Sequence, residues 1–303
     1  MIRVVLVTSG LLLAVAAPAA PVPKRVVKDE VAKFFVAAEK GRGNTSVFWG
    51  LPQEEVVREL ATYFEHESGL RRSMSVTIAA SVGRHAKEAA ARTLAIDVLL
   101  KHATGADGGK KRNAVQALDG LLAFKKADFP LAAGAAVEKL VRSDDPHPSA
   151  LLLAGILGLK SVTDDLKKLS DTIPGRPRFE NPAWSAHLAL GRLGEAASVK
   201  HCVERIENEL DAVQRERHFP ELAFLRHADG LKSLTGFLDS DARLPGAKPA
   251  DPGPKVALRA LTAMAAVVEG FPVPADLTHT YTEEQLATAR KWVKEQKAIK
   301  WKE

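Results

Sequence analysis

The sequence contains a single cysteine, Cys202, and only 6% of its 303 residues are aromatic. One cysteine excludes a disulfide bond within the chain, so packing must hold the fold together. Stretches in which Val, Ile, Thr or Tyr alternate with polar residues are missing, which argues against a protein built from β-strands. After residue 17 no apolar run has the length of about 20 residues that a membrane span needs. These absences favour a helical, disulfide-free mature chain.

Apolar residues make up 46% of the chain, and Ala and Leu supply most of them. That content is sufficient for a sizeable core and too high for a disordered chain. Ala and the unbranched side chains lose little conformational freedom in a helix. We therefore predict an all-α fold.

The formal charge at neutral pH is +6, from 43 basic and 37 acidic residues. Such a surface is compatible with anionic partners, including acidic polymers and anionic lipid. The excess is small for so many charged residues, and it is also what solubility alone would produce. Net charge therefore does not assign a partner.

The N-terminus has the pattern of an export signal. Arg3 precedes an apolar run at residues 4–17, and Ala17-Pro18-Ala19 fits a small-x-small cleavage site. We expect residues 1–19 to be removed and residues 20–303 to be periplasmic or secreted. The alternative is an uncleaved short anchor.

Turn residues divide the mature chain into helix pairs. Helices expected at 29–40 and 52–67 come first. The expected pairs are 70–83 with 87–102, 110–124 with 129–142, 148–158 with 162–172, 182–194 with 196–214, 219–227 with 230–239, and 254–270 with 282–297. A Pro/Gly-rich loop is expected at 244–254, and helix 282–297 is expected to cap the C-terminal end.

The pairs repeat along the sequence. Leu153-Ala154, Leu188-Ala189 and Leu222-Ala223 hold corresponding places in the first helices of three successive pairs. Their spacing of about 35 residues lies in the range of helical repeats. A helix pair cannot bury both of its apolar faces alone, so neighbouring pairs are expected to stack. This predicts an α-solenoid of roughly six to seven pairs.

One segment resembles a known family. At residues 182–196, a helix with Ala186, Ala189 and Leu190 runs into a tight turn at Leu193-Gly194. This segment resembles a HEAT repeat of the bacterial HEAT/PBS-lyase-like type, and residues 281–292 resemble the closing helix of exported bacterial HEAT proteins. The resemblance implies an armadillo-type superhelix and a role in protein–protein scaffolding.

Complete catalytic and metal-binding motifs are missing from the sequence. His66-Glu67 begins like a zinc-protease helix but has no second His at the required spacing. Residues 105–111 resemble a phosphate loop without its Ser or Thr. Convergence of His66, His85 and His102 on a metal is an alternative to three helix-end histidines. We expect no enzyme activity, no cofactor and no metal.

A few single residues also carry expectations. Cys202 is expected to be a buried, inert thiol. Trp184 is expected to pack in the core or between repeats, and Trp292 is expected to cap the last repeat. Trp301, between two lysines at the end of the chain, has no assigned role.

The leading functional prediction is a non-enzymatic, exported scaffold that binds a protein partner. In a solenoid the concave face is expected to be lined by the second helix of each pair. The candidate interaction residues on that face are Lys87, Lys167, Lys168, Arg205 and Lys232.

Two other classes of function stay open. One is a module that binds acidic envelope polymers through Lys110-Lys111-Arg112 and Lys125-Lys126. The other is a HEAT-type enzyme, either lyase-like or glycosylase-like. Export argues against that enzyme and against nucleic acid as a partner, because the substrates are not expected outside the cytoplasm.

Overall fold

The chain folds into a succession of helices, as its composition predicted. The computed structural model describes residues 24–105, 111–172, 181–245, 252–276, 278, 280–296 and 299–302. In these segments there are fifteen α-helices and two short strands, so the all-α class is confirmed. Of the described helices, none combines the length and the apolar character that crossing a membrane requires. The expected signal sequence, 1–19, lies outside the described residues.

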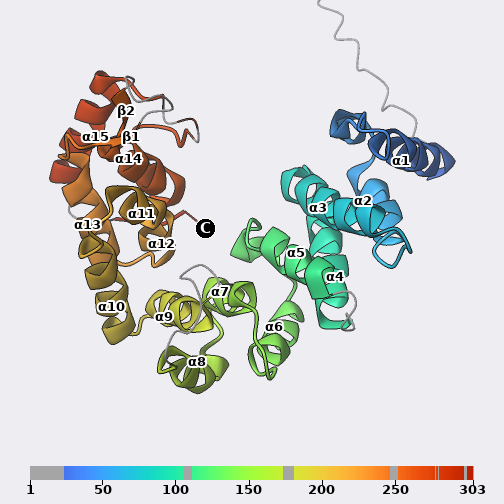
Figure 1. Ribbon diagram of the computed structural model, residues 1–303, viewed down its shortest axis with the longest axis horizontal. Coiled ribbons are helices and arrows are strands. Elements are labelled where there is room, and N and C mark those ends of the chain that lie inside the picture. The colour runs from blue at the N-terminus through green and yellow to red at the C-terminus, as the bar shows by residue number, and fades with distance from the viewer. Residues whose placement is uncertain are drawn as a thin grey trace, which may run out of the picture.

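The α-helices lie along an open arc, from α1 at one end to α15 at the other (Figure 1). Their bounds are α1 (Lys24–Ala38), α2 (Gln53–Ala61), α3 (Gly69–His85), α4 (Ala89–Gly105), α5 (Lys111–Leu121), α6 (Ala133–Val141), α7 (Pro148–Leu157), α8 (Thr163–Ser170), α9 (Pro182–Arg192), α10 (Ala196–Glu207), α11 (Ala212–Arg217), α12 (Phe219–Phe224), α13 (Ala228–Leu238), α14 (Val256–Val267) and α15 (Glu283–Glu295). Three 3-10 turns, η1 (Thr45–Gly50), η3 (Lys126–Asp128) and η4 (Lys160–Val162), join some of them.

The first helix of each pair faces the inside of the arc. In Figure 1, α5, α7, α9, α12 and α14 line the inner side, whereas α4, α6, α8, α10 and α13 lie outside. Each inner helix packs against the next one along the chain: α5 contacts α7, α7 contacts α9, α9 contacts α12, and α12 contacts α14. The expectation that the second helices line the concave side is therefore wrong.

Local sequence explains several helix ends. Asn181 caps α9 by accepting a hydrogen bond from the backbone of Ala183, and Pro182 occupies the first turn, where no N–H is needed. Thr282 and Gln285 cap α15 reciprocally. Gly158 ends α7 with a φ of 75°, a left-handed conformation that favours glycine.

Several segments differ from the sequence-based expectation. The first helix begins at Lys24 and not at residue 29, and the second ends at Ala61 and not at residue 67. Residues 196–214 were expected to form one helix, but α10 ends at Glu207 and α11 begins at Ala212. The carboxylate of Asp211 accepts hydrogen bonds from the backbone of Val213 and Gln214, which starts a new helix. The loop expected at 244–254 includes strands β1 (Arg243–Pro245) and β2 (Pro252–Lys255), which pair antiparallel.

The core continues through the whole stack. Buried apolar side chains form two clusters, and α9 contributes to both of them. Ala186, Ala189 and Leu190 belong to the N-terminal cluster, whereas Trp184 and Leu188 belong to the C-terminal one. Because α9 buries apolar side chains on both of its faces, the helices on either side of it rely on α9 to cover their own apolar side chains.

Small residues set the approach of the inner helices. A Cβ atom placed on Gly155 of α7 would lie 3.1 Å from the Cα of Ala189 in α9. The backbones of these two helices are therefore in direct contact, and only small residues fit at the crossing. When the helices on one side of a stack approach each other more closely than those on the other side, the stack bends toward the side of close approach.

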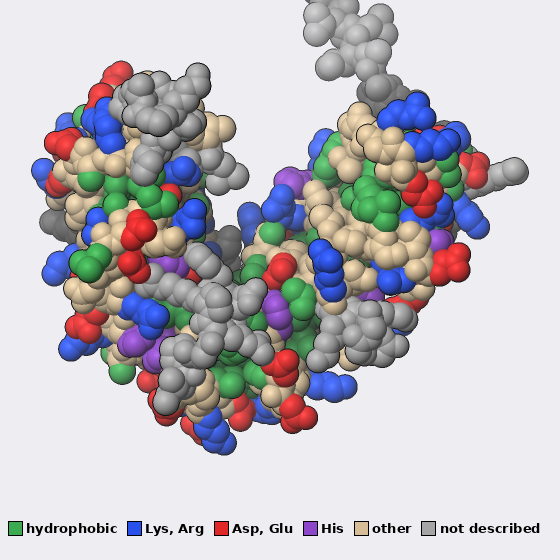
Figure 2. All heavy atoms as spheres, viewed as in Figure 1, with side chains coloured by type: hydrophobic (Ala, Val, Ile, Leu, Met, Phe, Trp, Pro, Cys, Tyr) green, Lys and Arg blue, Asp and Glu red, His purple; other side chains and the backbone are tan. Residues whose placement is uncertain are grey.

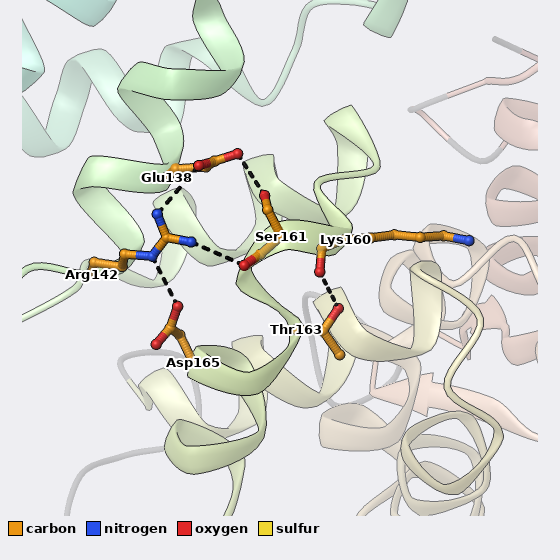
Figure 3. Close-up of polar contacts among 6 residues, drawn as sticks. All are labelled: Glu138, Arg142, Lys160, Ser161, Thr163 and Asp165. Atoms are coloured by element: carbon orange, nitrogen blue, oxygen red, sulfur yellow. Dashed lines mark hydrogen bonds and ion pairs between the residues drawn. The ribbon is translucent and has the colours of Figure 1, made fainter.

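Ion pairs tie the outer helices together. Figure 3 shows Arg142, the residue that follows α6, donating to three partners. Its Nε lies 3.0 Å from Asp165 Oδ2 in α8, its Nη2 lies 2.9 Å from the carbonyl oxygen of Ser161, and its Nη1 lies 3.3 Å from Glu138 Oε2. The side chains are partly exposed, so the contacts orient α8 against α6 more than they stabilise the fold.

Three of the four tryptophans, Trp184, Trp292 and Trp301, lie in the C-terminal half of the structure. Trp184 is buried, and Trp292 packs edge-on against Phe271 with ring centroids 5.2 Å apart, as expected for a capping residue. Trp301 is half-buried and pairs through its backbone with Val268. This pairing returns the end of the chain to α14, on the inner side of the arc (Figure 1).

Candidate functional site

The inner side of the arc contains a cleft of about 810 Å³. Its walls come from the end of α5 and η3, from α7, α9, α11 and α12, and from α14. These segments are far apart in the sequence, and the stacking of inner helices brings them together. The cleft is large enough for a sizeable ligand group, since binding pockets commonly span about 300–1,000 Å³.

Basic side chains dominate the charges of this cleft, which we call the basic cleft. Glu216 is the one acidic residue among those that line it. The basic residues are Lys125, Lys126, Arg192, Arg217, Arg226 and Arg259. In Figure 2, Lys and Arg side chains border the hollow of the arc on both sides. A concave surface lined by one sign of charge concentrates ligands of the opposite sign.

Arg192 is held rigidly in the cleft wall. It is the last residue of α9, and its Nη1 donates a 2.7 Å hydrogen bond to the carbonyl oxygen of Phe224. Its guanidinium also lies over the Phe224 ring. Burial, together with the nearby Arg226, lowers the pKa of Arg192 to about 10, so the group stays charged at neutral pH.

Arg226 has an unusual backbone conformation, and Arg259 is held by an ion pair. Arg226 follows α12 with a φ of 47°, a left-handed conformation that costs an ordinary residue about 1–2 kcal/mol. Arg259 of α14 forms an ion pair with Glu216, at 3.3 Å, which partly neutralises it.

Three cations in the cleft are available to a ligand. Lys125, Lys126 and Arg217 are exposed, and none of them forms an ion pair with another described residue. Lys126 lies over the end of α7: a Cβ on Gly158 would be 3.2 Å from its Nζ. Its ammonium therefore reaches from η3 to the next inner helix.

Apolar side chains form the rest of the cleft. Phe124, Ile156, Phe224 and Val267 contribute to its lining, together with several alanines. An anion with no apolar part would leave this surface exposed to water. The chemistry of the cleft therefore suits a ligand that combines negative charge with apolar groups.

Two further clefts follow the basic cleft along the inner face: the first, which we call the middle cleft, adjoins the basic cleft, and the second adjoins only the middle cleft. The first, of about 610 Å³, shares Pro220 and Phe224 with the basic cleft and also contains His147 and Glu221. The second, of about 330 Å³, shares Asp119 with the first and extends to α3. The three clefts follow one another from α14 back to α3, so a long ligand would contact several pairs.

The middle cleft contains the closest approach to a catalytic arrangement. Ser149 donates its hydroxyl hydrogen bond to Asp119, and His147 lies beside it. The Nδ1 of His147 accepts the backbone N–H of Ser149 at 3.3 Å, so this nitrogen caps α7 and does not contact the hydroxyl. The contacts are those of a helix N-terminus.

The residues predicted from the sequence as the interaction surface lie elsewhere. Lys87 precedes α4, Lys167 and Lys168 lie on α8, Arg205 on α10 and Lys232 on α13. All five are exposed, but none of them lines the basic cleft or the two clefts that follow it. Lys167 pairs with Glu195 at 2.9 Å, and Arg205 lies over the Trp184 ring.

The cleft arginines were not predicted, although a pattern for them exists. Lys125 and Lys126 follow α5, Arg192 ends α9 and Arg226 follows α12, so each lies at the C-terminal end of a first helix. Cations are favoured there because the helix dipole is negative. This shared position places them in the same cleft, although the last turn of α7, between α5 and α9, has no basic residue. Only Lys125-Lys126 stood out as a sequence run.

Metal-binding candidates do not converge. His66 stacks on Tyr63, His85 packs edge-on against Trp49, and His102 lies beside Phe64. Across the described residues, we find no group of three or more His, Cys, Asp or Glu side chains placed to hold a metal ion. Most of the segment that resembles an incomplete phosphate loop, residues 106–110, lies outside the described residues.

Comparison of the sequence with protein-family models gave no match, and a search of curated proteins gave none either. The HEAT-type resemblance therefore rests on the residues of segment 182–196 and the repeat pattern around it.

Proposed function

We propose that this protein is an exported α-solenoid of the HEAT type that binds a protein partner along the inner face of its arc and has no catalytic role. The repeat pattern supports the solenoid assignment, and so does the order of contacts, in which each inner helix meets the next. Stacked helix pairs offer an extended surface that a short chain segment or a domain can follow.

One observation carries this proposal: the three clefts follow one another along the inner face and draw their residues from α3, from α11, from the inner helices α5, α7, α9, α12 and α14, and from the turns between them. Compact ligand sites need only one such cleft. A row of adjoining clefts is suited to an extended protein segment that contacts several helix pairs in turn. The inner face is therefore the surface on which we expect the partner.

The proposed location rests on the N-terminal residues. Arg3, the apolar run and Ala17-Pro18-Ala19 together form the three parts of a secretory signal. Mass spectrometry of the protein recovered from outside the cytoplasm should find an N-terminus at Ala20. An intact Met1 on a membrane-associated protein would support the anchor alternative instead.

The binding face can be tested without knowledge of the partner. Ala266 is an exposed residue of α14 in the basic cleft, and Ala135 is an exposed residue of α6 outside the clefts. Ala266→Trp should reduce capture of proteins from the exported fraction, because a large uncharged side chain fills the cleft. Ala135→Trp should capture the same proteins as the unmodified chain. Equal capture by both variants would contradict the proposal.

A second candidate function is the binding of an acidic envelope polymer. The observation in its favour is that Lys125 and Lys126, which stand out in the sequence, both line the basic cleft. Binding of a polyanion should disappear steeply as salt rises, whereas a protein partner held partly by apolar contacts should keep measurable affinity.

A further inference from the structure

We propose that the basic cleft receives an extended peptide segment that carries acidic residues beside large apolar ones. The proposal rests on the function proposed above, in which the inner face binds a protein, and it names the chemistry of the segment that binds. Charge, apolar surface and shape each support it.

The charge of the cleft selects an acidic ligand. Six basic residues line it against one acidic residue, Glu216, which already pairs with Arg259. Lys125, Lys126 and Arg217 are exposed and are not engaged by any described carboxylate. Carboxylates of a ligand would give these groups the partners that the fold itself does not supply.

The apolar lining selects a ligand that is more than a string of charges. Phe224 lies between the basic cleft and the middle cleft and lines both of them. Arg192 holds Phe224 from one side, because its guanidinium donates a hydrogen bond to the Phe224 carbonyl oxygen and lies over the Phe224 ring. A preformed apolar surface between fixed cations provides an anchor for a Leu or Phe side chain at low entropic cost.

The shape of the inner face selects an extended ligand. The basic cleft continues past Pro220 and Phe224 into the middle cleft, where Asp119 and Glu221 contribute the acidic side chains. The charge along the inner face therefore changes sign between the two clefts. A peptide in this groove would place its acidic residues beside Lys125, Lys126 and Arg217, and its neutral or basic residues in the middle cleft.

Fluorescence anisotropy with labelled peptides tests this assignment on the mature full-length chain. The probe is a fluorescein-labelled peptide of sequence Glu-Glu-Leu-Phe-Glu-Glu-Leu. One comparison peptide has Lys in place of every Glu, and another has Ser in place of Leu and Phe. We expect the first peptide to bind about tenfold or more tightly than either comparison peptide, because each lacks one of the two required features.

Matched triple variants then locate the site. Lys125→Glu/Lys126→Glu/Arg217→Glu reverses the three exposed cleft cations. Lys101→Glu/Lys139→Glu/Lys294→Glu makes the same change of charge at exposed residues of α4, α6 and α15 that are not in the clefts. The first variant should weaken binding about tenfold or more, and the second by less than about threefold. Unchanged circular dichroism of both would show that the fold is retained.

The possible outcomes separate this proposal from the one it rests on. Equal binding of the acidic peptide and its Ser-substituted form would show that the cleft binds polyanions in general, and it would overturn this inference. Loss of binding in both triple variants would show that the net charge of the protein, and not the basic cleft, determines peptide binding. That result would also overturn the inference. Absence of peptide binding would overturn the ligand assignment, whereas the uncharged Ala266→Trp variant tests the binding face independently of the partner's charge.

Discussion

The guanidinium carbon of Arg192 lies 4.7 Å from the centre of the Phe224 ring, and the same side chain hydrogen-bonds to the Phe224 carbonyl oxygen. One residue at the end of α9 thereby fixes both the backbone and the side chain at the end of α12. Both residues line the basic cleft. The contact that joins two successive repeats therefore also shapes the proposed binding surface.

Loss of this contact should weaken the fold. Arg192→Ala removes the hydrogen bond and the packing over the ring, so we expect the free energy of unfolding to fall by about 1–3 kcal/mol. Arg217→Ala, at an exposed cleft residue, should change it by less than about 0.5 kcal/mol. Urea unfolding followed by circular dichroism measures both. Equal midpoints for Arg192→Ala and the unmodified chain would show that the contact contributes nothing.

The crossing of α7 and α9 should not tolerate a methyl group. In Gly155→Ala the new Cβ would press on the backbone of Ala189, and we expect a loss of about 1–3 kcal/mol. Gly236 in α13 is the matched control, since its Cβ would meet no atom within 4 Å. Gly236→Ala should raise stability by about 0.5–1 kcal/mol, because Ala is the better helix former. Thermal melts should shift in opposite directions, and a shift in the same direction would contradict this packing.

Stability should decrease in mild acid because of two stacked histidines. The rings of His187 and His201 lie 4.1 Å apart. Burial, with a contribution from His201, lowers the pKa of His187 to about 4 from its usual 6.5, and burial also lowers the pKa of His201. The unfolded chain binds protons near pH 6.5 and the folded chain does not, so unfolding becomes easier as the pH falls from 6.5 toward 4.

Urea unfolding at stepped pH measures this effect. The stability of the unmodified chain should decrease through that interval, and that of His187→Gln should decrease less, because one of the titrating groups is gone. Above pH 7 the imidazole of His187 is neutral in both states, so it gives stability no slope there. The same slope in both proteins between pH 6.5 and 4 would rule out His187 as its source.

Cys202 should be unreactive until the protein unfolds. Its side chain is fully buried in α10, and burial, with Glu221 nearby, raises the pKa of the thiol. A disulfide reagent at pH 8 should label the folded protein more than about a hundredfold more slowly than the urea-unfolded protein, which supplies the control rate. Rapid labelling of the folded protein would mean that α10 opens readily or that the thiol is exposed.

Much of the helical pattern was predictable because its signals are local. Asn181 and Pro182 mark the start of α9, and Gly158 the end of α7, through backbone chemistry that needs no tertiary context. The split between α10 and α11 was missed, since the capping hydrogen bonds of Asp211 compete with an otherwise continuous helical sequence. Charge and apolar spacing in that segment fit one helix as well as two.

The curvature and the cleft could not be predicted, because they depend on contacts between repeats. Both helices of a pair carry Ala and Leu, so composition does not tell which one faces inward. The close approach of Gly155 to Ala189 is a property of the packed structure. Lys126, Arg226 and Arg259 come from separate segments, and only the arc brings them into one cleft.

Site-specific photo-crosslinking tests the central claim, that the inner face holds the partner, most directly. A benzophenone amino acid replaces Arg217 in the basic cleft of one protein and Lys139 on the outer helix α6 of another, and each is irradiated in the native exported fraction. We expect a discrete crosslinked protein from position 217 that the acidic Leu-Phe peptide competes away, and none from position 139. Crosslinks from position 139 alone, or from both positions equally, would contradict it.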